Sequence, residues 1–175
     1  VPQLVKFLTR WNMHSSDGIK TAFDHWFNPI GTMFANNKQI TSFRGFKLFT
    51  GLKVLGDVLP YYISFSNCTS LETIELPSSL VMLSYQSLFN TGLKEITIPA
   101  NVREISGESI MRNKKLTTII LLPETPPKIS NSSIHGLNEN LKYIYVPDSC
   151  LELYKQEYSS FWLAKLIHPL SEYHP

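Results

Sequence analysis

Hydrophobic residues recur along the chain in one phrase, Leu-x-x-Ile-x-apolar, which a proline closes. The phrase begins at Leu71, Leu93, Leu116 and Leu141, so the leucines recur after 22, 23 and 25 residues. A unit of this length cannot enclose a hydrophobic core by itself, whereas stacked copies bury a continuous one. The pattern therefore predicts a stack of repeats that displays a surface.

Within each repeat, alternating apolar and polar residues predict a short strand. In residues 71–77 the leucines and Ile74 are expected to point inward, and the polar residues between them outward. The proline ends the strand because it lacks the N–H that a ladder needs. A second apolar cluster, such as residues 102–111, is expected to form the return side of each coil.

The pattern changes before the first clear repeat. Residues 1–38 do not repeat, and we expect them to form an N-terminal cap with a short helix over residues 21–27. Residues 40–43 and 52–55 look like imperfect entry repeats, so residues 39–147 are assigned to the repeats. Such caps cover the apolar interior and the unpaired strand edges of an end coil.

The pattern changes again after Pro147. Residues 148–175 are expected to form a C-terminal helical cap and a tail. Residues 148–158 read as a helix that Asp148 or Ser149 can cap. Its apolar face is formed by Leu151, Tyr154 and Tyr158.

Composition excludes several function classes. The chain has 175 residues with 43% hydrophobic content and a net charge of +2, which suits one globular domain. No basic stripe is present, so we do not expect nucleic acid binding, and no apolar run reaches the length of a membrane span. Cys68 and Cys150 fall at different points of the repeat, so we predict two buried free thiols. We also expect the chain to be a monomer.

In its repeats the chain resembles a BspA-like leucine-rich repeat protein. Residues 93–105 match the family's repeat, Leu-x-x-Ile-x-Ile/Leu-Pro-x-x-Val-x-x-Ile, at every marked position, and residues 67–71 match its Cys-x-x-Leu junction. The likeness extends over about residues 40–165 and is specific to the family. Residues 40–52 resemble the entry segment of such domains in gut anaerobic bacteria. It implies an α/β leucine-rich repeat solenoid, rich in β structure, with short parallel strands on the concave face and small helical caps at both ends.

The resemblance also implies a location and a role. Members look like secreted or cell-surface proteins, often implicated in adhesion or in partner binding. No signal peptide is visible, and the chain begins abruptly at Val1, as a trimmed or mature chain would.

Little in the sequence suggests chemistry. Related proteins carry a calcium-loop phrase before the repeats, but here its first position is Met13, which offers no carboxylate, so we expect a degenerate remnant and no metal. Asp24 and His25 are adjacent and so are poor candidates for a triad. Glu72, Glu75 and Glu95 could approach as a carboxylate pair, but a solvated strand face is expected. We therefore predict no enzyme activity, no catalytic residue and no cofactor.

The variable outward positions of the strands are the candidate binding site. They form columns across neighbouring strands, and tyrosines stand out in the last repeat because they offer contact area and a polar tip. The alternative is that these tyrosines pack against the C-terminal cap. The candidate ligand-binding residues are Thr73, Glu75, Glu95, Thr97, Thr118, Ile120, Tyr143 and Tyr145.

Three functions remain open at this point. The first is a non-catalytic module that binds a protein or peptide through the concave face. The second is a carbohydrate-binding surface component, which would use Tyr143, Tyr145 and Trp162 or Trp26 as stacking platforms. The third is a structural spacer without a ligand.

Overall fold

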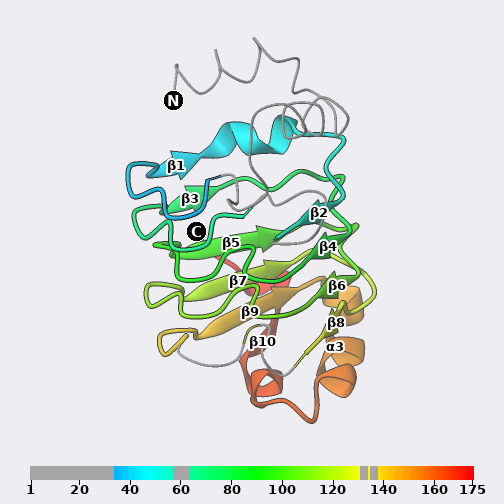
Figure 1. The fold of residues 1–175 in the computed structure, drawn as a ribbon. Coiled ribbons are helices and arrows are strands. Elements are labelled where there is room, and N and C mark those ends of the chain that lie inside the picture. Colours follow the sequence, from blue (N-terminus) through cyan, green and yellow to red (C-terminus); the bar gives the residue numbers. More distant parts are fainter. Residues whose placement is uncertain (1–33, 57–63, 131–133, 135–137) are drawn as a thin grey trace.

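The computed structural model describes residues 34–56, 64–130, 134 and 138–175. Strands from successive repeats pair in parallel and form two columns, which Figure 1 shows side by side along the chain. Each of the first four coils contributes one strand to each column. The predicted cap over residues 1–38 and its helix lie almost wholly outside the described residues.

The first column carries the repeated phrase. Residues on β5, β7, β9 and β10 are paired in one ladder, and β1 pairs with β3 in a second, shorter ladder. We call the outward side of this column the strand face. Its strands are β1 (Ser42–Phe43), β3 (Thr73–Ile74), β5 (Glu95–Ile98), β7 (Thr118–Leu121), β9 (Tyr143–Val146) and β10 (Ile167–Pro169).

The second column is a parallel ladder on the return side of the coils. The return side was predicted, but its regular pairing was not. Residues 52–55 were wrongly interpreted as an entry repeat: they contain β2 and belong to the return side of the first coil. The strands are β2 (Val54–Leu55), β4 (Met82–Leu83), β6 (Glu104–Ile105) and β8 (Lys128–Ile129).

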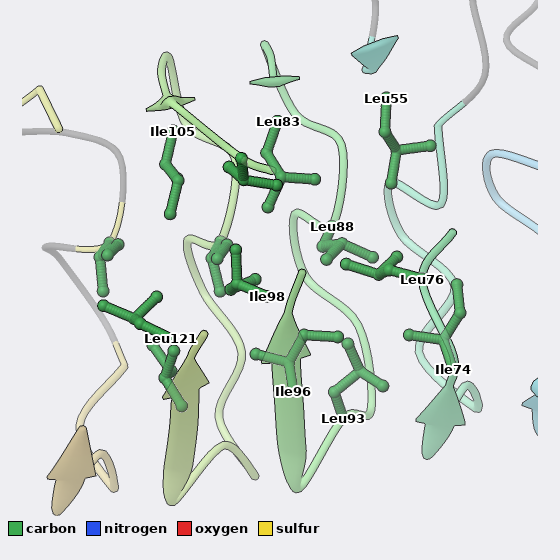
Figure 2. Packing of buried hydrophobic residues seen from close by; sticks show 14 of the residues in the cluster. Leu55, Ile74, Leu76, Leu83, Leu88, Leu93, Ile96, Ile98, Ile105 and Leu121 are labelled. Carbon is green, nitrogen blue, oxygen red and sulfur yellow. The ribbon is translucent and has the colours of Figure 1, made fainter. Parts of the chain in front are cut away.

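The hydrophobic core fills the space between the two columns. Leu83 and Ile105 reach in from the return side and face the apolar side chains of the repeated phrase, such as Ile96 (Figure 2). These three side chains are at most 1% exposed. The predicted inward direction of Leu71, Ile74 and their equivalents is confirmed, because all of them are buried. Burial of this kind contributes about 25 cal/mol for each Å² of apolar surface.

Two buried asparagines tie successive turns together. The Asn113 Oδ1 atom accepts hydrogen bonds from the backbone N–H and the hydroxyl of Thr91, at 2.6 and 2.7 Å. The Asn113 backbone N–H in turn donates to Oδ1 of Asn138, at 2.8 Å. These side chains replace the backbone partners that a turn lacks, which lets the turns stay buried.

The C-terminal helix of the described chain is short. It consists of a 3₁₀ turn, η2 (Asp148–Cys150), followed by α3 (Leu151–Glu157). Neither Asp148 nor Ser149 caps it with a side-chain hydrogen bond, so that prediction is wrong; the Asp148 carboxylate accepts from Ser171 N–H instead, at 2.9 Å. The predicted apolar face is confirmed, since Tyr154 and Tyr158 are 0% and 2% exposed.

Two hydroxyls fix α3 against the repeats. The hydroxyls of Tyr154 and Tyr158 donate to the carbonyls of Pro123 and Pro127, at 2.7 and 2.6 Å. Burial raises the pKa of both phenols above the ordinary value. After α3 the chain continues through η3 (Trp162–Leu166), joins the first column as β10 and ends in η4 (Leu170–Glu172) and a short extension.

Both cysteines are free thiols, as predicted. Cys68 is fully buried and donates to the carbonyl of Phe34, whereas Cys150 is only half-buried, so its predicted burial is wrong. No helix in the described ranges is long and apolar enough to cross a membrane.

Candidate functional site

The ladder aligns the outward side chains in two of the predicted columns. Glu95, Thr118 and Tyr143 are register partners on β5, β7 and β9. A second column contains Thr97, Ile120 and Tyr145, and it continues to His168 on β10. Strand pairing therefore brings six of the eight candidate residues together on one sheet.

The C-terminal half of this face is covered. Thr118, Ile120 and Tyr145 are only 9%, 6% and 9% exposed, although they point out from the sheet. Tyr143, at 42%, is the exception. Its ring stacks on Tyr145 and meets the edge of His168, at centroid distances of 5.9 and 5.6 Å. Both tyrosine rings therefore contact the C-terminal region through His168, as the alternative expected, but Tyr143 also keeps an exposed surface.

Residues 170–173, which we call the strap, provide the cover. The hydroxyl of Tyr173 donates to the Glu95 carboxylate, lying 2.9 Å from each oxygen. The Tyr173 ring meets the Tyr145 ring edge-on, 5.2 Å between centroids. Burial, with the hydrogen bond to Glu95 as a smaller cause, raises the pKa of Tyr173. Because β7 lies between β9 and β5, a side chain that joins Tyr145 to Glu95 must pass over Thr118 and Ile120.

The N-terminal half of the strand face is interrupted. β3 lies beside β5, but the two are not joined in one ladder. Lys94 and Ile98 give their carbonyls to Thr117 and Leu122 in the next repeat. Successive residues of a strand direct their backbone groups to opposite sides, so Glu95 and Thr97 direct theirs toward β3. We call this boundary the seam.

A hollow of about 430 Å³ lies at the seam, on the open part of the strand face. Four of the eight candidate residues line it, including Thr73 and Glu75, which are not in register with the longer ladder. The lining residues are Arg44, Glu72, Thr73, Ile74, Glu75, Lys94, Glu95 and Thr97.

Charges of both signs surround this hollow. The Glu72 carboxylate accepts from the ammonium groups of Lys94 and Lys115, at 3.0 and 3.4 Å. These hydrogen bonds and the two positive charges lower the pKa of Glu72. Glu75 pairs with Lys47 at 2.6 Å. Exposed pairs such as these contribute little to stability, but they give the hollow a fixed pattern of charge.

The arrangement suits binding better than acid–base chemistry. Glu72 and Glu75 are each paired with lysine and Glu95 with Tyr173, so the imagined carboxylate pair has other partners. Within the described ranges, no group of three His, Cys, Asp or Glu side chains could hold a metal ion. The calcium-loop remnant, the pair Asp24 and His25, and Trp26 all lie outside those ranges. Trp162 is part-buried against the core.

The candidate ligand-binding residues predicted from the sequence omit Tyr173 and four residues that line the hollow, which are Arg44, Glu72, Ile74 and Lys94. Tyr173 comes from the segment read as a tail, and no repeat signal relates it to Glu95, which lies 78 residues away. Arg44 follows the entry strand, in η1 (Arg44–Leu48). The repeated phrase is imperfect there, so the sequence does not indicate toward which side the Arg44 side chain points. An aromatic residue just after the last apolar cluster was the one available hint for Tyr173.

Comparison with known families gives one result. The family model described as a BspA type leucine-rich repeat region matches residues 61–162 in six copies, which is more than half of the chain. No curated protein matches the chain.

Proposed function

Because the chain belongs to the BspA-type leucine-rich repeat family, we propose that it is a non-catalytic binding module that recognises a protein or peptide through its strand face. The observation that carries this proposal is the hollow at the seam, where outward side chains of both charges border an interrupted sheet. Scaffolds of this kind stack repeats to present one extended surface to a partner.

A peptide fits the hollow for two reasons. The backbone groups of Glu95 and Thr97 point to the seam, where no ladder joins β5 to β3, so a peptide that enters the hollow can hydrogen-bond to them. Arg44 and Lys94 on one hand and the glutamates on the other offer partners to charged peptide side chains. The volume of about 430 Å³ suits a few peptide side chains and is too small for a whole domain.

A carbohydrate ligand is the second candidate. One observation favours it: the exposed Tyr143 ring, backed by Tyr145, offers the kind of flat surface on which a sugar stacks. A spacer without a ligand is the third candidate, and it predicts no binding at this face. We further propose that the chain belongs to a secreted or cell-surface bacterial protein that acts as a monomer, a proposal that rests on the family.

Binding selection on the full chain tests the proposed function. A random peptide library and a glycan array are each screened against the native chain, and the hits are titrated against Thr73→Arg and Thr97→Arg, which fill the hollow. We expect peptide hits whose affinity falls about tenfold or more in both variants.

Thr125→Arg is the matched control, because Thr125 is an exposed threonine in the loop between β7 and β8. It should leave the affinity unchanged. Peptide hits that bind all four proteins equally would reject the hollow as the site, and glycan hits lost only in Tyr143→Ala would favour the second candidate.

A further inference from the structure

The strap crosses the strands instead of following them. It leaves the sheet after Pro169 on β10, passes β9 and β7, and reaches Glu95 on β5. Figure 1 marks the C-terminus at the level of β5. Three strand spacings amount to about 14 Å. Residues 170–172 form the 3₁₀ turn η4, which advances only about 2 Å per residue, so the Tyr173 side chain spans much of the remaining distance to Glu95.

One side chain makes the distant contact. Tyr173 is half-buried, while Ser171, Glu172, His174 and Pro175 around it are exposed. Near the start of the strap, Ser171 is held by Asp148 and Glu172 lies 3.2 Å from His168 Nδ1. Leu170 is half-buried and η4 lies against β9, so the contacts of Tyr173 with Tyr145 and Glu95 hold the far end of the strap.

The environment of Tyr173 has the form of a phenol-binding site. The Glu95 carboxylate accepts a hydrogen bond from the Tyr173 hydroxyl, and the Tyr145 ring supplies an aromatic edge contact. Charge-assisted hydrogen bonds of this type are stronger than neutral ones, and aromatic pairs add to them. The site also adjoins the hollow at the seam, because Glu95 lines both.

We propose that the strap is a built-in occupant of a tyrosine-binding site on the strand face, and that a partner peptide with a tyrosine side chain binds there by displacing it. This inference rests on the proposed function and names the ligand class and its regulation. The strap competes with any partner as an intramolecular ligand. It lowers the partner's apparent affinity by about the ratio of the populations with the strap bound and with the strap released. Release uncovers Thr118, Ile120 and Tyr145.

A peptide with the sequence of the strap tests this directly. The probe is Leu-Ser-Glu-Tyr-His-Pro, amidated and carrying a fluorophore on an N-terminal glycine linker, so that it has no terminal charge. It is titrated by fluorescence anisotropy against the full native chain and the full chain with Tyr173→Ala. We expect saturable binding to the variant, about tenfold or more tighter than to the native chain.

Two controls define the contacts. Tyr85→Ala removes an exposed tyrosine next to β4, away from the strap, and should bind the probe as the native chain does. A probe with Phe in place of Tyr should bind the Tyr173→Ala chain at least about fivefold more weakly than the Tyr probe does, because Glu95 then accepts no hydrogen bond from the probe. Equal binding by native and Tyr173→Ala chains, or none by the variant, would overturn the inference.

A second variant covers the case in which Tyr173→Ala does not fold. Tyr173→Phe keeps the ring and removes the hydroxyl, and we expect the amides of residues 171–174 to exchange hydrogen about tenfold faster than in the native chain. Unchanged exchange would show that the strap is fixed by other contacts. If library peptides bind at the seam but the strap probe does not, the inference fails while the proposed function stands. Probe binding without any library hit would support the tyrosine-binding site and reject the hollow at the seam as the peptide site.

Discussion

Asn113 is buried inside the turn between two repeats and uses its whole amide. Its oxygen accepts hydrogen bonds from the backbone N–H and the hydroxyl of Thr91, and its nitrogen donates to the carbonyl of Leu88 at 2.9 Å. Asn138 acts similarly in the next turn. Its oxygen accepts from the backbone N–H of Asn113, and its nitrogen donates to the carbonyls of Ile110 and Ile134. At residue scale, then, a few buried polar side chains add to the stability that the repeated leucines provide.

Asn113→Ala should lower the free energy of unfolding by about 2–4 kcal/mol, because it leaves buried donors and acceptors without partners. Asn140→Ala is the matched control: its amide donates to the Lys114 carbonyl at an exposed position and should cost under about 1 kcal/mol. Urea denaturation of the three proteins measures both values. Equal losses in the two variants would contradict this account of the turns.

Cys68 gives a prediction on pH. Burial raises the pKa of its thiol from about 9 to about 11, so the unfolded chain loses this proton at lower pH than the folded chain does. The folded state therefore loses stability as pH rises from about 9 to about 11. Urea denaturation across this range should show a shallower fall for Cys68→Ala than for the native chain, with Cys150→Ala as control. Parallel pH profiles for Cys68→Ala and native protein would refute it.

At the scale of elements, the interruption between β3 and β5 separates the strand face into two ladders. The repeats on either side of it keep the same phrase, and their leucines are 22 residues apart instead of 23 or 25. The return side is not interrupted, since β2, β4, β6 and β8 form one ladder. The molecule thus stays continuous on one side and opens a hollow on the other.

Hydrogen exchange tests the seam. The amides of Glu95 and Thr97 point toward β3 without a ladder, whereas Tyr143 donates to the Thr117 carbonyl at 3.1 Å and Tyr145 follows it in the β7–β9 ladder. We expect exchange at Glu95 and Thr97 to be about tenfold or more faster than at the two tyrosines. Protection of Glu95 and Thr97 equal to that of Tyr143 would show that the sheet continues across the seam.

At the scale of the whole molecule, the periodic part was the predictable part. The phrase set the strands, their order and their inward side chains, because burial imposes a strict alternation on a strand. Ile120 was expected to be exposed, but it is buried under the strap. The sequence gives no periodic signal for this cover, because Tyr173 lies 78 residues from its partner Glu95. The seam was equally invisible, since β3 and β5 carry the same phrase. The variable positions of the site were found, and what covers them was not.

The central claim is that the strand face is the binding surface. Amide exchange of the native chain, measured with and without the tightest peptide from library selection, tests it most directly. The account predicts slower exchange at Glu95, Thr97 and Thr118, with faster exchange at residues 171–174 if the peptide carries a tyrosine. Protection confined to Met82, Glu104 and Lys128 on the return side would contradict it.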